Sequence, residues 1–181
     1  MFQFIQQMNA MLGKRLLLSF SVAVVLMASV SASAATVELE WVEPDSFRDI
    51  HPGGNSREKF REDTFAELEA NFAKLATERL PTAQILQITV RDLDLAGYVN
   101  VDSKTRRKRF VSSKYFPRIK FNYKLLAENG AVIKAGGVIL KKPDFMETTS
   151  DENKALTLGY EKQMIDEWFK YTFGPREEDE S

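Results

Sequence analysis

The turn sequence Asn129-Gly130 constrains the fold of this chain more than any other feature, because both residues readily take positive φ and favour a tight β-hairpin. Segment 118–126 before it alternates strictly between apolar and polar residues, as a strand with one buried face does. Segment 132–140 is the expected return strand, which Pro143 ends. A longer loop with a bulge at Gly130 would shift the register by one residue. With the turn centred on Asn129-Gly130, the pairs are Leu125 with Lys134, Tyr123 with Gly136 and Phe121 with Val138.

Residues 85–100 are the second organising stretch, and they predict the central strand of the sheet. Alternate residues from Leu86 to Val90 are apolar, which gives the strand one buried face. The alternation slips by one residue after Asp92, since Leu93 and Leu95 become the apolar pair. Either the strand ends at this point or a β-bulge resets its register.

The remaining elements follow from periodicity and from start and stop signals. We expect a strand at 36–42 ended by Pro44, a helix at about 56–80 capped by Asn55 or Ser56, a hairpin joining 98–101 to 110–113, and a C-terminal helix that starts at Ser150 or Asp151 and ends at Gly174-Pro175. The apolar face of the C-terminal helix is expected to carry Leu156, Tyr160, Met164, Trp168 and Tyr171, flanked by Ile165 and Phe169.

This order of elements predicts an α+β fold. We expect a mostly antiparallel sheet of about four to five strands, with two amphipathic helices packed on one face. A right-handed crossover through the first helix would make the first two strands parallel.

The N-terminal segment 1–35 has the features of a cleaved secretory signal peptide. Lys14-Arg15 precedes an apolar run at 16–28, and Ala32-Ser33-Ala34 has the A-x-A pattern of a cleavage site. We expect cleavage after Ala34 or Ala35 and a periplasmic or secreted product that is not an integral membrane protein. The alternative is an uncleaved N-terminal anchor. A start at Met11 rather than Met1 would give a signal peptide of more typical length.

Cleavage would leave a single α+β domain at 36–175 and an acidic tail at 176–181. Hydrophobic residues make up 44% of the chain and charged residues 28%, which is typical of globular proteins. The chain has no cysteine, and this excludes disulfides, thiolate zinc sites, thiol catalysis and a lipid-modified N-terminal cysteine. No cofactor is predicted.

Five segments together resemble a known family. They are VELEWVEP at 37–44, F-x-D-I at 47–50, S-R-x-x-F at 56–60, T-V-x-D-L-D-L-A-G at 89–97 and P-R-I-x-F-x-Y at 117–123. The chain therefore resembles the DUF3016 family of exported bacterial proteins over about residues 37–145. The resemblance implies export and the extent of the domain, and it implies no activity. The basic run at 104–109 resembles a local addition to a variable loop.

Asp92, Asp94 and Arg118 are the candidate ligand-binding residues. If the strand persists, the two aspartates point to the same side about 7 Å apart, a spacing at which carboxylates can hold a hard cation or act as acid and base. Arg118 follows Pro117 and can bind a carboxylate or phosphate through its planar guanidinium. The alternative is structural: Asp92 would bind backbone N–H groups or pair with a cation such as Arg118, and Arg118 would pair with Asp92, Asp94 or Glu40.

The basic residues Arg106, Arg107, Lys108 and Arg109 form a candidate patch for an anionic partner. They lie in a segment that also carries Phe110, Tyr115 and Phe116. Since we expect export, anionic lipid head groups, cell-wall polymers or an acidic envelope protein are expected partners, and nucleic acid is not. The alternative is a solvated loop.

His51, the only histidine, lies in a Pro/Gly loop and has no nucleophile motif near it. Without a second histidine, a histidine zinc site is not expected either. The sequence is consistent with two functions. The favoured one is a non-enzymatic envelope protein that binds a ligand or partner. The alternative is a small metal-dependent or hydrolytic enzyme that uses Asp92 and Asp94.

Overall fold

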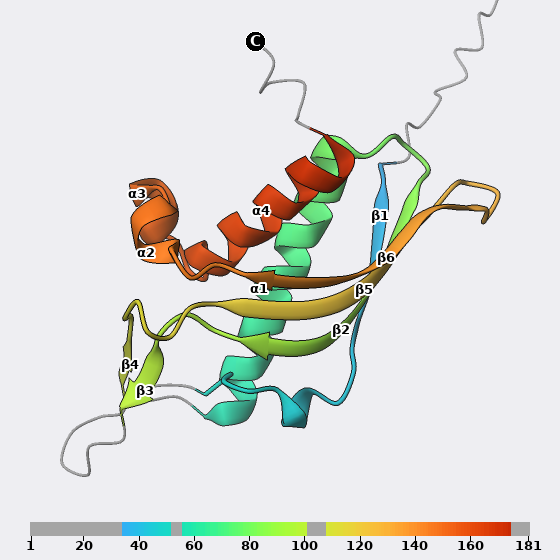
Figure 1. The fold of residues 1–181 in the computed structure, drawn as a ribbon. Helices are drawn as coiled ribbons and strands as arrows, with labels where there is room; N and C mark the ends of the chain where they lie inside the picture. Colours follow the sequence, from blue (N-terminus) through green and yellow to red (C-terminus); the bar gives the residue numbers. More distant parts are fainter. Residues whose placement is uncertain (1–33, 52–55, 101–107, 175–181) are drawn as a thin grey trace, which may run out of the picture. The chain divides into compact units, whose positions relative to one another are not determined.

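The computed structural model describes residues 34–51, 56–100 and 108–174. They form a four-stranded sheet in the order β1-β2-β5-β6 and a separate two-stranded sheet (Figure 1). Strand β1 runs parallel to β2, and the other neighbours in the large sheet are antiparallel. The strands are β1 (Thr36–Trp41), β2 (Ile85–Asp94), β3 (Tyr98–Asn100), β4 (Lys108–Phe110), β5 (Arg118–Leu126) and β6 (Val132–Lys141).

Two long helices cover one face of the large sheet. The helices are α1 (Arg57–Arg79), α2 (Phe145–Thr148), α3 (Asp151–Lys154) and α4 (Gly159–Phe173), with a short 3-10 helix, η1, at Pro44–Ser46. Phe72 of α1 and Trp168 of α4 both make edge contacts with Phe121 of β5, with ring centroids 5.9 and 4.8 Å away. The predicted α+β fold and the parallel first pair of strands are therefore confirmed.

The register of the β5–β6 hairpin agrees with the sequence. Phe121 pairs with Val138, Tyr123 with Gly136 and Leu125 with Lys134, and the next pair, Leu126 with Val132, is shifted. Gly130 has a φ of 80°, which an L-residue rarely adopts, so this glycine sets the geometry of the turn. The hairpin thus combines the predicted pairing with an irregularity beside the turn.

Helix α1 begins as predicted, because the Ser56 side chain accepts a hydrogen bond from the Lys59 amide at 3.2 Å. Ser150 caps a helix in the same way, but the helix that it starts is the four-residue α3 rather than one long C-terminal helix. The chain takes a left-handed conformation at Leu158 before α4 begins at Gly159. A Cβ at Gly159 would lie 1.6 Å from the Asn153 carbonyl oxygen, so the two helices approach too closely for any other residue.

The break between α3 and α4 corrects the predicted buried face. Leu156 lies before α4 and is exposed, and Tyr171 is 92% exposed on α4. Met164, Ile165, Trp168 and Phe169 are buried as predicted, and Gly159 and Glu161 complete the buried stripe of α4. Across the described residues, no helix is both long and apolar enough to cross a membrane.

Candidate functional site

A β-bulge at the end of β2 brings the two candidate aspartates to the open face of the sheet. The register of β2 against β5 jumps between Val90 and Asp92, so that Asp92 pairs with Lys120 and Asp94 with Arg118. The intervening Leu93 is fully buried on the helix side. The slip in the sequence pattern is therefore a bulge that resets the alternation, and the strand continues through it.

Asp92 is engaged by two arginines. Its Oδ2 atom lies 3.2 Å from Nε of Arg48 and accepts a hydrogen bond from Nη2 of Arg118 at 3.3 Å. Arg48 comes from the segment after η1, so the ion pairs connect this segment to β2 and β5. Two cations around one carboxylate offset its charge, as in the structural alternative considered for Asp92 and Arg118.

Asp94 is in a less favourable electrostatic position. Its pKa is raised above 3.8 by burial and by the negative charge of Asp49, while Arg118 and Arg48 oppose the shift. Asp49 and Asp94 form an isolated parallel β-bridge, which holds their backbones together. A carboxyl group with a raised pKa is a possible acid or base. In the part of the chain that the structure describes, however, no three histidine, aspartate or glutamate side chains gather in a way that could hold a metal ion.

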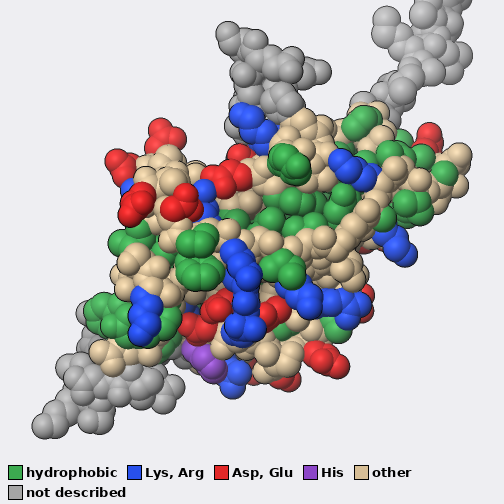
Figure 2. Space-filling model, viewed as in Figure 1, with side chains coloured by type: hydrophobic (Ala, Val, Ile, Leu, Met, Phe, Trp, Pro, Cys, Tyr) green, Lys and Arg blue, Asp and Glu red, His purple; other side chains and the backbone are tan. Residues whose placement is uncertain are grey.

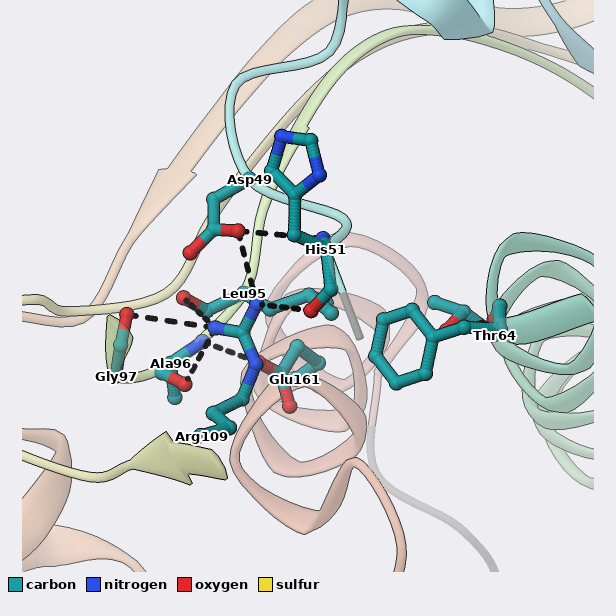
Figure 3. A network of polar contacts seen from close by, with 9 residues as sticks. Asp49, His51, Thr64, Leu95, Ala96, Gly97, Arg109 and Glu161 are labelled. Carbon is teal, nitrogen blue, oxygen red and sulfur yellow. Dashed lines mark hydrogen bonds and ion pairs between the residues drawn. The ribbon is translucent and has the colours of Figure 1, made fainter. Parts of the chain in front are cut away.

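Arg109 lies at the centre of a polar network beside this cluster (Figure 3). Its Nη1 atom donates to the carbonyl oxygens of Leu95, Ala96 and Gly97 at 3.5, 3.2 and 3.4 Å. Its Nη2 atom donates to Oδ1 of Asp49 at 2.9 Å and to the carbonyl oxygen of His51 at 3.1 Å. One guanidinium thus joins β4 to the end of β2 and to the segment at 47–51.

Glu161 joins the same network from the opposite side. This carboxylate is 2% exposed and accepts a hydrogen bond from the Ala96 amide at 2.7 Å. Burial raises its pKa above 4.5, while the Ala96 hydrogen bond and the charge of Arg109 act in the other direction. Helix α4 is therefore tied to the turn between β2 and β3.

Sequence reasoning missed Asp49, Glu161 and the part that Arg109 plays. A signal for Glu161 was present, because it lies three and four residues before Met164 and Ile165 and so falls on the apolar stripe of α4. Nothing local to Arg109 distinguishes it from the basic residues before it. Arg106 and Arg107 lie outside the described residues, and Lys108 is described by its backbone alone.

His51 contributes backbone groups to the network rather than its ring. Its amide donates to Oδ1 of Asp49 at 3.3 Å, and its carbonyl oxygen accepts from Arg109. The residue is exposed, and Figure 3 shows the imidazole directed away from the Arg109 guanidinium.

The small sheet and the segment after β4 together carry an aromatic patch, which we define as the half-buried Tyr98 and the exposed Phe110, Val111 and Tyr115, with the neighbouring Lys114. The Tyr98 ring lies 4.9 Å from that of Tyr115 and 6.1 Å from that of Phe110, between centroids. Phe110 is 47% exposed and Tyr115 is 42% exposed. Lys114 Nζ lies 5.5 Å from the centroid of the Tyr115 ring. Figure 2 shows hydrophobic side chains beside basic ones over this part of the molecule.

A model of one protein family matches residues 35–171, which is most of the chain. The chain belongs to the DUF3016 family. The DUF3016 description is of a protein of unknown function, so membership assigns no reaction or ligand. No match was found among curated proteins or among solved structures. The DUF3016 match extends beyond residue 145 and takes in α2, α3 and most of α4.

Three of the segments that carry the resemblance to DUF3016 proteins meet at the charged cluster. F-x-D-I supplies Asp49, D-L-D-L-A-G supplies Asp92, Asp94 and the carbonyls that Arg109 binds, and P-R-I supplies Arg118. The DUF3016 motifs thus lie where the 47–51 segment, β2 and β5 are joined. Their contacts in this structure are mainly with one another.

Proposed function

We propose that this DUF3016 protein is exported through a cleaved signal peptide and acts in the cell envelope as a non-enzymatic protein that binds an anionic lipid surface. The basic, apolar and small-residue regions before residue 36 support export. Cleavage after Ala34 or Ala35 would leave β1, which begins at Thr36, intact. The family match begins at residue 35, next to the expected cleavage site, which supports this proposal.

The observation that carries the binding proposal is the aromatic patch on the small sheet and the segment after β4. Tyrosine and phenylalanine rings partition to the membrane interface, where apolar ring surface leaves water and polar atoms stay hydrated. Lys114 adds a positive charge beside Tyr115. The sequence that connects β3 to β4 contains Arg106 and Arg107, and β4 begins at Lys108. Each basic residue near an anionic membrane contributes about 1 kcal/mol of attraction.

The state of the acidic cluster supports a binding protein over an enzyme. Asp92 is already paired with Arg48 and Arg118, so a ligand at this carboxylate would have to displace an arginine. The raised pKa of Asp94 favours the enzymatic alternative, because general acids and bases need such shifts. A hydrolase that used Asp94 would lose its activity in an Asp94→Asn variant.

Vesicle flotation tests the lipid proposal. The purified protein is mixed with vesicles of phosphatidylcholine alone or of phosphatidylcholine with phosphatidylglycerol, at low and high salt. We expect binding to the anionic vesicles alone, weakened by salt. The double variant Phe110→Ser/Tyr115→Ser should lose most of it.

The matched control is Tyr171→Ser, which removes a more exposed aromatic ring from α4 and should bind like the wild type. Equal binding by the double variant, or equal binding to uncharged vesicles, would contradict the proposal. Binding to a soluble polyanion without binding to vesicles would contradict the lipid part of it. Export is tested by the intact mass of the protein in the periplasmic fraction, which should match a chain that begins at Ala35 or Thr36.

A further inference from the structure

Strand β6 forms one edge of the large sheet and is unusually exposed for a ten-residue strand. Ile133 is 52% exposed and Ile139 is 59% exposed, and no described residue outside β5 pairs with β6 in the sheet. Long apolar edge strands are normally shortened, bent or charged, because their free N–H and C=O groups recruit other strands. The edge at β1, by comparison, has six residues.

The register of β6 against β5 determines which side chains point to each face. Val138, Gly136 and Lys134 pair with inward-facing residues of β5, so they point to the helix side. The residues between them point to the open side. The open face of β6 is therefore formed by Ala135, Gly137, Ile139 and Lys141. Ile133 is 52% exposed and follows this row at the bulge between Val132 and Lys134, where the register against β5 shifts.

We propose that β6 pairs with β6 of a second copy of this chain, antiparallel and about a twofold axis at Gly136, so that the two sheets become continuous. An axis perpendicular to the sheet keeps the open faces of both copies on the same side. With the axis at Gly136, Ile133 lies opposite Ile139 of the second copy. Lys134 lies opposite Val138, and Ala135 opposite Gly137.

This register is self-complementary in apolar surface and keeps the lysines of the two copies apart. Both exposed isoleucines gain a large apolar neighbour, a type of cross-strand pair that stabilises sheets by about 0.2–1 kcal/mol. No lysine lies opposite a lysine, and the two glycines at the axis leave room for the backbones to approach.

In the neighbouring registers, Ile133 no longer lies opposite Ile139 of the second copy. An axis at Gly137 places Ile133 opposite Lys141, and an axis at Ala135 places Ile133 opposite Gly137. The strand thus favours one pairing with itself, which commits the proposal to a second copy rather than to an unrelated peptide. The surface lies on the large sheet, so the inference is independent of the lipid binding proposed for the small sheet.

Cysteine crosslinking tests the register, because the chain has no cysteine of its own. Ile133→Cys and Ile139→Cys chains are purified separately, mixed, and treated with a short thiol-to-thiol crosslinker. We expect a crosslinked dimer in the mixture. Each variant alone should give little, since identical positions lie six residues apart along the paired strands, about 20 Å. Mixing Ile133→Cys with Tyr171→Cys chains is the control and should give none.

Sedimentation velocity of the wild type over a range of concentrations tests the dimer itself. We expect a shift from monomer to dimer as the concentration rises, and loss of the dimer in Ile139→Lys, whose circular dichroism shows whether the fold is kept. A wild type that stays monomeric at every concentration would overturn the proposal. Crosslinking of Ile133→Cys chains to one another as readily as to Ile139→Cys chains would overturn the register.

Discussion

Replacing Arg109 by alanine should destabilise the fold more than any single change at the surface. The guanidinium makes five hydrogen bonds, four of them to carbonyl oxygens and one to Asp49. The Arg109 side chain is 19% exposed and that of Asp49 is 23% exposed, so the pair is mostly shielded from water. Breaking a buried ion pair costs about 3–5 kcal/mol, and the partial exposure of the Arg109–Asp49 pair places its cost at about 3 kcal/mol.

Thermal and urea unfolding of the wild type and Arg109→Ala measure this loss. A change of about 3 kcal/mol corresponds to a fall of about 10 °C in Tm for a domain of this size. Arg109→Lys keeps the charge but loses the planar fork, so its Tm should lie between the two. Lys114→Ala, a change at an exposed neighbouring cation, is the control and should shift Tm by little. A loss below about 1 kcal/mol in Arg109→Ala would refute the view that Arg109 anchors the small sheet.

Three further predictions concern the same end of the molecule. Burial raises the pKa of Glu161 above 4.5, so its proton favours the folded state below that pH and this stabilisation is lost as pH rises through the folded-state pKa. We therefore expect the free energy of unfolding of Glu161→Gln to increase relative to that of the wild type as the pH rises from about 4 to 8. Parallel stability curves for the two proteins would contradict this. Gly97→Ala should destabilise far more than Gly130→Ala in urea unfolding: both glycines have positive φ, but a Cβ at Gly97 would lie 2.2 Å from the Phe110 carbonyl oxygen and one at Gly130 meets nothing. Equal losses would contradict the close contact. Asp92→Asn should lower Tm without any ligand, and Ca²⁺ or Zn²⁺ should not raise the Tm of the wild type; a rise that the variant loses would establish a cation site.

Much of the fold could be predicted because it depends on local pattern. The alternation in β5, the turn at Asn129-Gly130 and the cap at Ser56 each follow from a few adjacent residues. The prediction of one long C-terminal helix was wrong. The break at Leu158 depends on the close approach of Gly159 to Asn153, which the periodicity of the sequence does not reveal.

The candidate site was harder to predict because its contacts join distant segments. The slip at Asp92 was consistent with either a strand end or a bulge, and the structure has the bulge. The Asp92–Arg118 pair was one of the alternatives for these two residues. The link from Arg109 to Asp49 spans 60 positions, and no local pattern encodes it. A basic run indicates charge, but it does not show which of its members turns inward.

We propose that this protein binds through its small sheet, while the charged cluster at the end of β2 is structural. Amide chemical shifts, followed by NMR while phosphatidylglycerol-containing bicelles are added, test it most directly. We expect the largest changes at Tyr98, Phe110, Val111 and Tyr115, with β2 unchanged near Asp92. Changes centred on Asp92, Asp94 and Arg118, with the aromatic patch unaffected, would contradict it.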